Sequence, residues 1–551
     1  MLTLKWYKLN VLQSEKNQNI EEILLENRGI KSSELDSFFE PSIENLFDPF
    51  LFVGMDRAVA KILEMRDKKG RVVVFWDYDV DGVSSTAMLS KFLAEIWVEV
   101  SYRLPHRVND GYWLKSHFID DIAEKNVKLL ITVDCGTRDI EVINYAKTKK
   151  IEMIITDHHA VPEIIPENVV ALINPKLKNS PYPNSNLSGS GVAFKLLHAL
   201  TLTLFPKNEV EKILKKYIDL AMLGTVADCM PLVWENRIIA FAWLKQLKNT
   251  SSHWLKKLIE WTNWDSLDAD IVWFKIWPKL NAAGRMDSPY KALKVLLAWE
   301  KNLDEVMDEI ETLNTKRKIS TEKFYKKAGE VIRWNESVIF FNSTEIEHWI
   351  IWLIAGRLCE TYNRVAIVLK DEWDKLVASC RSPENISIID VLEEMKDLFL
   401  FFGGHNWAAG FTITKKNYSE FKKTIEKKVA HLSCNLNTDK ILNVDCPLNI
   451  EEINYKLLEN IEKMRPFGIW NPKPLFLIKN FKYTVLNFLW KDEKHLKFIT
   501  NDKNINTKAF GFWDYFREIK ESKKISLIVE IERNLWNGKT SIDLNIKDIL
   551  L

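Results

Sequence analysis

Short apolar runs alternate with helical stretches from residue 71 onward, and this alternation restricts the fold more than any other feature of the chain. The apolar runs RVVVF, KLLITV and IEMIIT are separated by the helical stretches STAMLSKFLAEI and IEVINYAKTK. Strands that alternate with helices of this length are typical of β-α-β units, whose strands are parallel. The sequence therefore predicts an α/β domain built on a parallel sheet.

The remaining patterns predict a chain of several domains. With 551 residues, the chain exceeds the roughly 250–300 residues at which single hydrophobic cores stop growing. The runs SVIFF, RVAIVL and KLVASC indicate a second α/β region, and short strand-like runs near the C-terminus indicate a small β-barrel. We expect an N-terminal helical arm at 1–70, the parallel-sheet domain at 71–289, a charged helical connector at 290–335, the second α/β domain at 336–435 and the barrel at 436–551.

Composition limits the setting in which the chain works. No apolar run approaches the roughly 18 residues that cross a bilayer, and residues 1–18 lack the apolar core of a secretory signal. The six cysteines form no C-x-x-C pair, which argues against a disulfide framework and a thiolate zinc site. The net charge is +1, so nucleic-acid binding would need a local basic groove. We expect a cytoplasmic protein without membrane association.

Acidic and histidine side chains directly follow three of the predicted strands. In an open α/β sheet the carboxyl ends of adjacent strands converge on one crevice, which would bring these side chains together. A further aspartate ends the helical run LGTVAD. The set is Asp77, Asp79 and Asp81 after the first strand, Asp134 after the second, Asp157, His158 and His159 after the third, and Asp228.

Such a set suits a metal centre. Carboxylates and imidazoles are the ligands expected for Mn²⁺ or Mg²⁺, and two such ions about 3.5–4 Å apart would clamp a phosphodiester and activate a water. Asp134 is the natural bridging ligand. Taken alone, an Asp-rich turn is as often a solvated loop, and a His pair is more often structural. Their joint occurrence after successive strands favours the metal centre.

These motifs resemble those of a known family. DYDVDG, VDCGT, TDHH and GTVADCMPL are similar to the four motifs of DHH phosphoesterases, and NPK at 174–176, SGSGVAFKLLHAL from Ser188 and PKLNAAGRMDSP from Pro278 resemble its RecJ-like exonuclease branch. GGHNWAAG from Gly403, with CRS at 380–382, resembles the DHH-associated nucleic-acid-binding domain. PFGIWNPKP from Pro466 resembles the segment that enters an oligonucleotide-binding barrel. The resemblance implies a multi-domain α/β fold with a DHH-type parallel-sheet lobe, a DHH-associated α/β lobe and a C-terminal oligonucleotide-binding (OB-like) β-barrel.

The resemblance also implies an activity and a set of site residues. The activity is 5′–3′ exonuclease hydrolysis of single-stranded DNA with two divalent cations, Mn²⁺ or Mg²⁺, in DNA repair and recombination. A helicase or a single-strand-binding protein as partner stays open. The metals would be carried by Asp77, Asp79, Asp81, Asp134, His158 and Asp228, with His159 near the scissile phosphate and Asp134, His158 and His159 as the catalytic set. Phosphates of the strand would be held by Arg285, Arg357, Arg381, Ser382, Gly403, Gly404 and His405.

Two alternative functions remain open at this point. A short-oligonucleotide or cyclic-dinucleotide phosphodiesterase would share the metal centre but would not need the C-terminal barrel. A non-catalytic nucleic-acid-binding subunit of a larger assembly would share the barrel but would have no chemical reason to keep the metal ligands.

Tryptophan stands at many positions where the resembled family has glycine. Average usage predicts roughly 39 glycines in a chain of this length, whereas the sequence has 18 Gly and 21 Trp. Glycine near a metal or phosphate site allows a positive φ and a close backbone approach, which an indole hinders. We hypothesise that UGA codons meaning glycine in the source are written as tryptophan; the alternative is a diverged or inactive homologue. The positions are Trp76, Trp97, Trp113, Trp243, Trp273, Trp277, Trp349, Trp352, Trp470, Trp490 and Trp513.

Overall fold

The computed structural model divides the chain into two compact units. One unit contains Leu9–Ile310 and Asn443–Leu551, and the other contains Glu311–Leu442. No described helix is both long and apolar enough to cross a membrane. Asp77, Trp6, Trp113 and Trp490 lie outside the described residues. The structure describes residues 3–5, 7–13, 19–76, 79–103, 114–247, 250, 252–262, 268–297, 303–333, 336–435, 440–489, 494–500, 505–522, 524–536 and 538–551.

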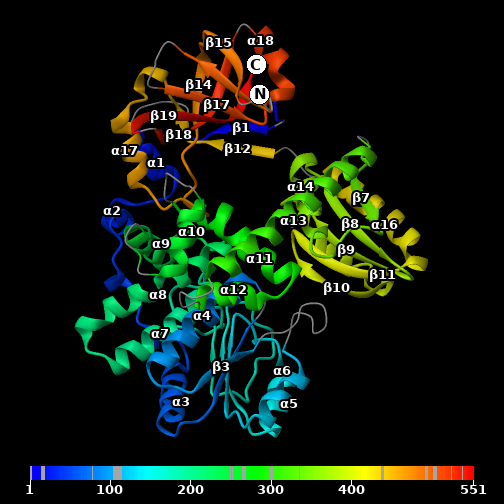
Figure 1. Ribbon diagram of the computed structural model, residues 1–551. Coiled ribbons are helices and arrows are strands. Elements are labelled where there is room, and N and C mark those ends of the chain that lie inside the picture. Colours follow the sequence, from blue (N-terminus) through cyan, green and yellow to red (C-terminus); the bar gives the residue numbers. More distant parts are fainter. Residues whose placement is uncertain are drawn as a thin grey trace. The chain divides into compact units, whose positions relative to one another are not determined.

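The predicted parallel sheet is confirmed and lies among the helices of residues 55–227 (Figure 1). Its strand order is β3-β2-β4-β5-β6, and all four pairings are parallel. Trp76, Val133 and Thr156, the last residues of β2, β4 and β5, lie in register. The turns that follow these strands therefore leave the sheet at one edge. The strands are β2 (Val72–Trp76), β3 (Val100–Arg103), β4 (Leu129–Val133), β5 (Glu152–Thr156) and β6 (Ala171–Ile173).

Helices cover both faces of this sheet because its strands are apolar on both sides. Val72 and Val74 pack into one core, whereas Val73 and Phe75 pack into a second core. Alternation along a strand sends successive side chains to opposite faces. The first core includes α3 (Met55–Asp67), α4 (Val80–Glu95), α7 (Gly189–Leu204) and α8 (Lys207–Ala227), and the second includes α5 (Ser116–Glu124) and α6 (Ile140–Thr148).

The segment expected as a connector at 290–335 contains two helices with different partners. The apolar residues of α12 (Pro289–Leu297) pack into the core of the parallel-sheet domain. The following helix, α13 (Leu303–Val331), buries Leu303, Met307 and Ile310 in that same core. Its later residues Phe324 and Ala328 pack in the second unit. Charge patterning found the helices but could not show where their few apolar residues pack. Along the chain, α8 and α12 are separated by α9 (Trp234–Leu247), α10 (His253–Thr262), a π-helix (Val272–Ile276) and α11 (Trp277–Met286).

The second unit is built on a mixed five-stranded sheet of order β10-β11-β9-β8-β7. Only β7 and β8 are parallel; the other pairs are antiparallel. Helices α13 and α14 pack on one face, and α15 and α16 pack on the other. The elements are β7 (Val338–Ser343), α14 (Ile351–Tyr362), β8 (Val365–Glu372), β9 (Lys375–Arg381), α15 (Ile388–Glu393), β10 (Phe399–His405), β11 (Ala408–Thr414) and α16 (Lys415–Asn435).

The C-terminal part of the first unit is a seven-stranded sheet whose core also contains the first part of the N-terminal arm. Ile23, Leu24 and Leu25 of α1 (Ile20–Asn27) are buried in that core. The arm is not wholly helical as expected, because Tyr7–Val11 form strand β1. Just beyond it, Leu12 N donates a hydrogen bond to Val444 O. The strands are β13 (Cys446–Pro447), β14 (Phe476–Phe481), β15 (Val485–Leu489), β16 (His495–Ile499), β17 (Ile505–Phe510), β18 (Ile525–Trp536) and β19 (Lys539–Leu550), with β12 (Lys440–Val444) before them and helices α17 (Tyr455–Lys463) and α18 (Phe516–Glu521) between them.

Candidate metal centre

The turn after β2 places two aspartates at the start of helix α4. Asp79 is the N-cap of the helix, and its carboxylate accepts a hydrogen bond from Gly82 N at 3.0 Å. An aspartate is favoured there because its oxygen satisfies an amide that has no partner within the helix. Asp81 lies in the first turn of α4 and is buried. The helix start therefore fixes both carboxylates at the edge of the sheet.

The N-terminus of helix α7 holds the Asp81 carboxylate from the other side. Gly189 N and Ser190 N donate hydrogen bonds to its two oxygens at 2.7 and 2.8 Å. Ser188 caps the same helix through a hydrogen bond from Gly191 N to its Oγ at 3.0 Å. Negative charge is stabilised at a helix N-terminus by the free amides and the helix dipole. Asp81 is thus anchored while its carboxylate still faces the cluster.

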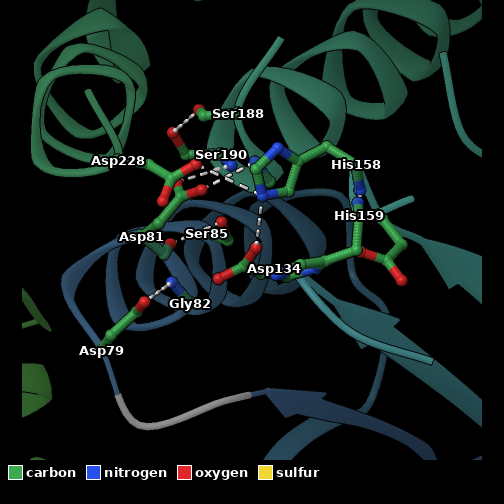
Figure 2. Close-up of polar contacts among 12 residues, drawn as sticks. Asp79, Asp81, Gly82, Ser85, Asp134, His158, His159, Ser188, Ser190 and Asp228 are labelled. Carbon is green, nitrogen blue, oxygen red and sulfur yellow. Dashed lines mark hydrogen bonds and ion pairs between the residues drawn. The ribbon is translucent and has the colours of Figure 1, made fainter. Parts of the chain in front are cut away.

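The other two carboxylates face one imidazole (Figure 2). His158 Nε2 lies 3.2 Å from Asp134 Oδ1 and 3.4 Å from Asp228 Oδ2. Asp134 follows β4 with a left-handed backbone, φ 60°, a conformation that non-glycine residues adopt rarely and often at functional sites. Asp228 is the C-cap of α8. Two strands and one helix therefore bring these three side chains together.

Burial and mutual repulsion shape the charges of this cluster. Burial, followed by the charge of Asp79, raises the pKa of Asp81 to about 6. Burial and the charges of Asp81 and Asp79 raise the pKa of both Asp134 and Asp228 well above the usual value. Burial lowers the pKa of His158 to about 3, so its imidazole is neutral near pH 7. A neutral imidazole among crowded carboxylates suits a bound cation, because ligands must be deprotonated and the cation removes the repulsion.

The residues fit a divalent cation. Ligand atoms of Asp81, His158 and Asp228 lie within 4.8 Å of one another, and so do those of Asp134, His158 and His159. Asp134 Oδ1 is buried, and no donor within the described part of the chain hydrogen-bonds to it. A buried carboxylate oxygen without a donor is costly unless a cation coordinates it. These two overlapping groups could hold cations through oxygen and nitrogen donors.

Asp157 supports the cluster without facing it. Its carboxylate accepts hydrogen bonds from Thr137 N at 2.9 Å and from His158 N at 2.7 Å. The ring of His159 lies against the same carboxylate, with Nδ1 2.8 Å from Asp157 Oδ1. Burial alone would lower the pKa of His159, but its hydrogen bond to Asp157 raises it to about 9. Asp157 therefore fixes the turn after β5 and the orientation of His159.

The expected phosphate-binding residues fall into separate places. Arg285 belongs to α11 of the first unit. Arg357 lies on α14, where its guanidinium pairs with Glu322 at 2.7 Å and stacks over the Tyr325 ring at 3.8 Å. Both partners of that ion pair are nearly half exposed, and pairs of this kind contribute little. The structure therefore gives Arg357 a structural contact that the sequence did not predict.

The remaining expected residues gather at one end of the second unit's sheet. Arg381 of β9 and His405 of β10 both pair with Ala408 of β11, so the three lie in one row across the strands. Gly404 pairs with the neighbouring Ala409. Ser382 follows directly, but its side chain is buried, and its Oγ donates to Ile386 O at 2.7 Å. The strands thus unite Arg381, Gly403, Gly404 and His405, whereas Ser382 holds the backbone.

Two glycines that the sequence did not single out provide room for the carboxylates. A Cβ on Gly189 would lie 2.5 Å from Asp134 Oδ1, and a Cβ on Gly224 would lie 2.1 Å from Asp81 Oδ1. Real Cβ atoms do not approach other atoms so closely. The small-residue run SGSG was a visible signal for Gly189. Gly224 begins the motif GTVADCMPL, but that motif does not show why glycine is needed there, because the neighbour of Gly224 comes from helix α4.

Asn174, at the end of β6, connects the two turns that carry the ligands. Its Nδ2 donates to Thr137 Oγ1 and to His159 O, both at 3.1 Å, and its Oδ1 accepts from Lys176 N at 2.9 Å. The side chain is fully buried. Asn174 therefore sets the distance between the turn after β4 and the turn after β5.

Replacing Asn174 with alanine is expected to weaken cation binding about 10–100-fold, as losing an outer contact of a metal ligand does. Asn236→Ala is the matched control, since Asn236 is equally buried and its Nδ2 likewise donates two hydrogen bonds, in this case to the backbone oxygens of Asn186 and Pro231. Both variants should lose about 1–3 kcal/mol of stability. Mn²⁺ titration calorimetry should separate them. Equal Mn²⁺ affinities in the two variants would show that Asn174 only stabilises the fold.

The chain matches three domain families. They are the DHH family N-terminal domain at residues 71–225, the DHHA1 domain at 335–431 and the RecJ OB domain at 444–548.

Curated relatives match along nearly the whole chain. The single-stranded-DNA-specific exonuclease RecJ of Bacillus subtilis is 29% identical over 536 residues, which cover 95% of this chain and 67% of that protein. The exonuclease of the same name from Haemophilus influenzae is 28% identical over 571 residues, covering 98% of each.

Two solved structures extend the similarity to the fold. RecJ from Thermus thermophilus in complex with Mn²⁺ superposes with a TM-score of 0.81 at 24% identity, covering 100% of this chain and 80% of that one. An exonuclease RecJ bound to manganese superposes with a TM-score of 0.62 at 28% identity, covering 70% of this chain and 98% of that one.

Proposed function

Because the chain belongs to the DHH family and carries the DHH, DHHA1 and RecJ OB domains in that order, we propose that it is a RecJ-like exonuclease that hydrolyses single-stranded DNA from the 5′ end. The observation that carries the proposal is the cluster of Asp81, Asp134, Asp228 and His158 at the edge of the parallel sheet. Relatives matched over nearly the full length are single-strand-specific exonucleases. DNA repair and recombination are the setting we propose, with a helicase or single-strand-binding protein as partner.

The cluster would hold two divalent cations, Mn²⁺ or Mg²⁺, both of which solved RecJ structures contain. When bound, such ions supply Lewis-acid stabilisation and a water of lowered pKa at neutral pH. His158 belongs to both groups of possible ligands, and Asp134 belongs to one of them and lies 3.2 Å from His158, so both residues would serve as cation ligands. Asp79, Asp81 and Asp228 would complete the set, and Asp77 is proposed on its motif alone.

His159 would orient the scissile phosphate. Its Nδ1 is engaged by Asp157, which leaves Nε2 to donate to a phosphate oxygen. The positively charged form is favoured by its carboxylate partner, which raises the pKa of His159 to about 9. A cationic donor fixed in orientation binds a phosphate oxygen more strongly than a neutral one.

The second unit would bind the sugar-phosphate backbone of the DNA strand. Arg381 offers a forked guanidinium, and Gly403 and Gly404 lack side chains that would keep a phosphate from the β10 backbone. His405 lies in the same row as Arg381. Contacts of this kind bind phosphates without reading sequence. Arg285 and Arg357 would add positive charge along the DNA strand. Arg357 would leave its ion pair with Glu322 and bind a phosphate instead.

End-labelled single-stranded oligonucleotides test the proposal. With Mn²⁺ present, we expect mononucleotides to be released from the 5′ end, no cutting of duplex DNA and no activity in EDTA. The assay should use the chain as written and a form with glycine in place of Trp76, Trp349 and Trp470. Comparison of the two forms shows whether an indole at these positions blocks activity. Asp134→Ala is the inactive control.

Other outcomes would replace the proposal. Release from the 3′ end would overturn the polarity. Cleavage of dinucleotides or cyclic dinucleotides alone would indicate the small-substrate phosphodiesterase. Binding of the strand without cleavage by either form would indicate a non-catalytic subunit.

A further inference from the structure

Four tryptophans have a backbone conformation that their side chains disfavour. Eleven non-glycine residues among those described have a positive φ, and four of them are tryptophan; the others are lysine, asparagine, aspartate or cysteine. A positive φ brings Cβ close to the following carbonyl oxygen, which is why glycine, and next asparagine or aspartate, usually occupies such positions. A large aromatic residue is not expected there. The four are Trp97 (φ 67°), Trp234 (φ 49°), Trp373 (φ 27°) and Trp470 (φ 71°).

Trp97 terminates helix α4 at a position where glycine is common. Trp97 N donates to Ala94 O and Val98 N donates to Leu93 O, which is the hydrogen-bond pattern of a Schellman motif with its left-handed residue at Trp97. Helix α1 ends in the same pattern, and there the left-handed residue is Gly29, with φ 68°. Four other described helices end in the same pattern with Lys69, Asn126, Lys150 or Cys229 at the left-handed position. The motif therefore accepts residues other than glycine, and Trp97 stands out as the only aromatic residue among these described caps.

Trp373 is the first residue of a two-residue hairpin loop. Glu372 and Lys375 are the last paired residues of β8 and β9, so Trp373 and Asp374 form the loop between them. Trp373 has a positive φ and Asp374 does not, and two-residue loops with a positive φ at the first position alone are II′ turns, which have glycine there. The geometry of this hairpin therefore favours glycine at position 373 and disfavours tryptophan.

Trp470 occupies the third position of a tight turn. Asn471 N donates to Gly468 O at 3.1 Å, which closes a four-residue turn with Ile469 and Trp470 in the middle. A positive φ at the second of the two middle residues is the mark of a type II turn, where glycine is needed. Trp234 has its positive φ at the first residue of α9.

For none of the four tryptophans does burial of the indole offset the free-energy cost of the backbone conformation. Their exposed fractions are 87% for Trp97, 57% for Trp234, 98% for Trp373 and 69% for Trp470. An exposed indole brings little hydrophobic stabilisation, because the effect scales with the apolar area removed from water. Uncompensated strain at the end of one helix, the start of another and two turns points to one common cause.

We propose that the natural polypeptide carries glycine at Trp97, Trp234, Trp373 and Trp470, encoded by UGA codons that its source reads as glycine. The family pattern had pointed to Trp97 and Trp470; the backbone adds Trp234 and Trp373. The scarcity of glycine, 18 beside 21 tryptophans, has the same origin. Buried indoles in regular elements, such as Trp243 in α9, are not decided by this backbone argument.

Peptide mass spectrometry of the protein isolated from its natural source tests the proposal. The tryptic peptides that contain positions 97 and 373 should each be lighter by the mass difference between tryptophan and glycine. The gene should have TGA at all four positions and TGG at Trp536, which we expect to be a genuine tryptophan. Tryptophan masses at these positions, or TGG codons, would overturn the proposal.

Stability supplies a second readout that does not need the source. The chain in which all four residues are changed to glycine should unfold at a higher temperature than the chain as written. Trp254→Gly, at a buried position of helix α10 that is not among the suspected glycines, should lower the unfolding temperature. A fall in the unfolding temperature of the fourfold variant would contradict the claim that these turns are built for glycine.

Discussion

Asp134→Asn is expected to abolish cation-dependent activity while leaving the cation-free protein at least as stable as the unchanged chain. Burial and the charges of Asp81 and Asp79 raise the pKa of Asp134 above the value of about 3.9 found in unfolded chains. The sign follows from linkage: a carboxyl with a raised folded-state pKa stabilises the fold only while protonated. That contribution is lost as the pH rises through the unfolded value toward the folded one. Near pH 7 the carboxyl group of Asp134 therefore lowers the stability of the fold, and asparagine, which does not ionise, removes this cost.

Thermal unfolding with EDTA and with Mn²⁺ measures both halves of the prediction. The unchanged chain should gain about 2.7 kcal/mol when Mn²⁺ is present at 100 times its dissociation constant, and Asp134→Asn should gain much less. Activity should fall at least about 100-fold, since a lost metal contact removes several kcal/mol of transition-state stabilisation.

Asp219→Asn is the matched control for this experiment. Asp219 is also buried, but its carboxylate accepts hydrogen bonds from Gln246, Thr250 and Ser252 and lies outside the metal cluster. Its replacement should cost about 1–3 kcal/mol and leave the response to Mn²⁺ intact. If Asp134→Asn unfolds earlier than the unchanged chain in EDTA, or keeps the full Mn²⁺ response, the carboxylate is not a cation ligand under repulsion.

The sequence predicted the centre of the parallel sheet well because burial there is uniform. Strands β2 and β4 are buried at every position and read as continuous apolar runs. Strand β3, with four residues and a half-exposed pattern, and β6, with three residues, were missed. Their pairing with β2 and β5 comes from the sheet and not from a local signal.

The positions of the carboxylates were predictable because each follows a strand or a helix end. The groups that surround the carboxylates were not predictable from the sequence. The hydrogen bond from Gly189 N to Asp81 joins residues 108 positions apart, and the close approach of Gly224 to Asp81 depends on helix α8 packing beside α4. Periodicity identifies a helix and its apolar face. It does not identify which neighbour that face will meet.

The N-terminal arm shows the same limit. The sequence predicted a helical arm, but no local pattern showed that its apolar residues Ile23, Leu24 and Leu25 pack against the C-terminal sheet at the other end of the chain. Arg357 was predicted as a phosphate ligand from its motif, and only the structure shows its pairing with Glu322. Local sequence determines elements, whereas long-range packing determines which groups are free to bind.

Gly189→Ala and Gly224→Ala are expected to reduce activity by about 100-fold or more, although alanine is the better helix former. In an open helix position, replacing glycine with alanine stabilises by up to about 1 kcal/mol. Here the new methyl carbon would lie 2.5 Å from Asp134 Oδ1 or 2.1 Å from Asp81 Oδ1, so the carboxylates must move. A displacement of about 1 Å at a reacting centre costs about 10²-fold in rate. Exonuclease rates and Mn²⁺ affinities of the two variants measure the effect.

Gly329→Ala separates the steric effect from helix propensity. Gly329 lies in helix α13, and a Cβ added there meets no atom within 4 Å. This variant should be slightly more stable than the unchanged chain and equally active. The cluster variants should instead bind Mn²⁺ more weakly because their ligands are displaced. If Gly189→Ala and Gly224→Ala behave like Gly329→Ala, the carboxylates have room that the structure does not give them, and the assignment of these two helices as walls of the metal centre fails.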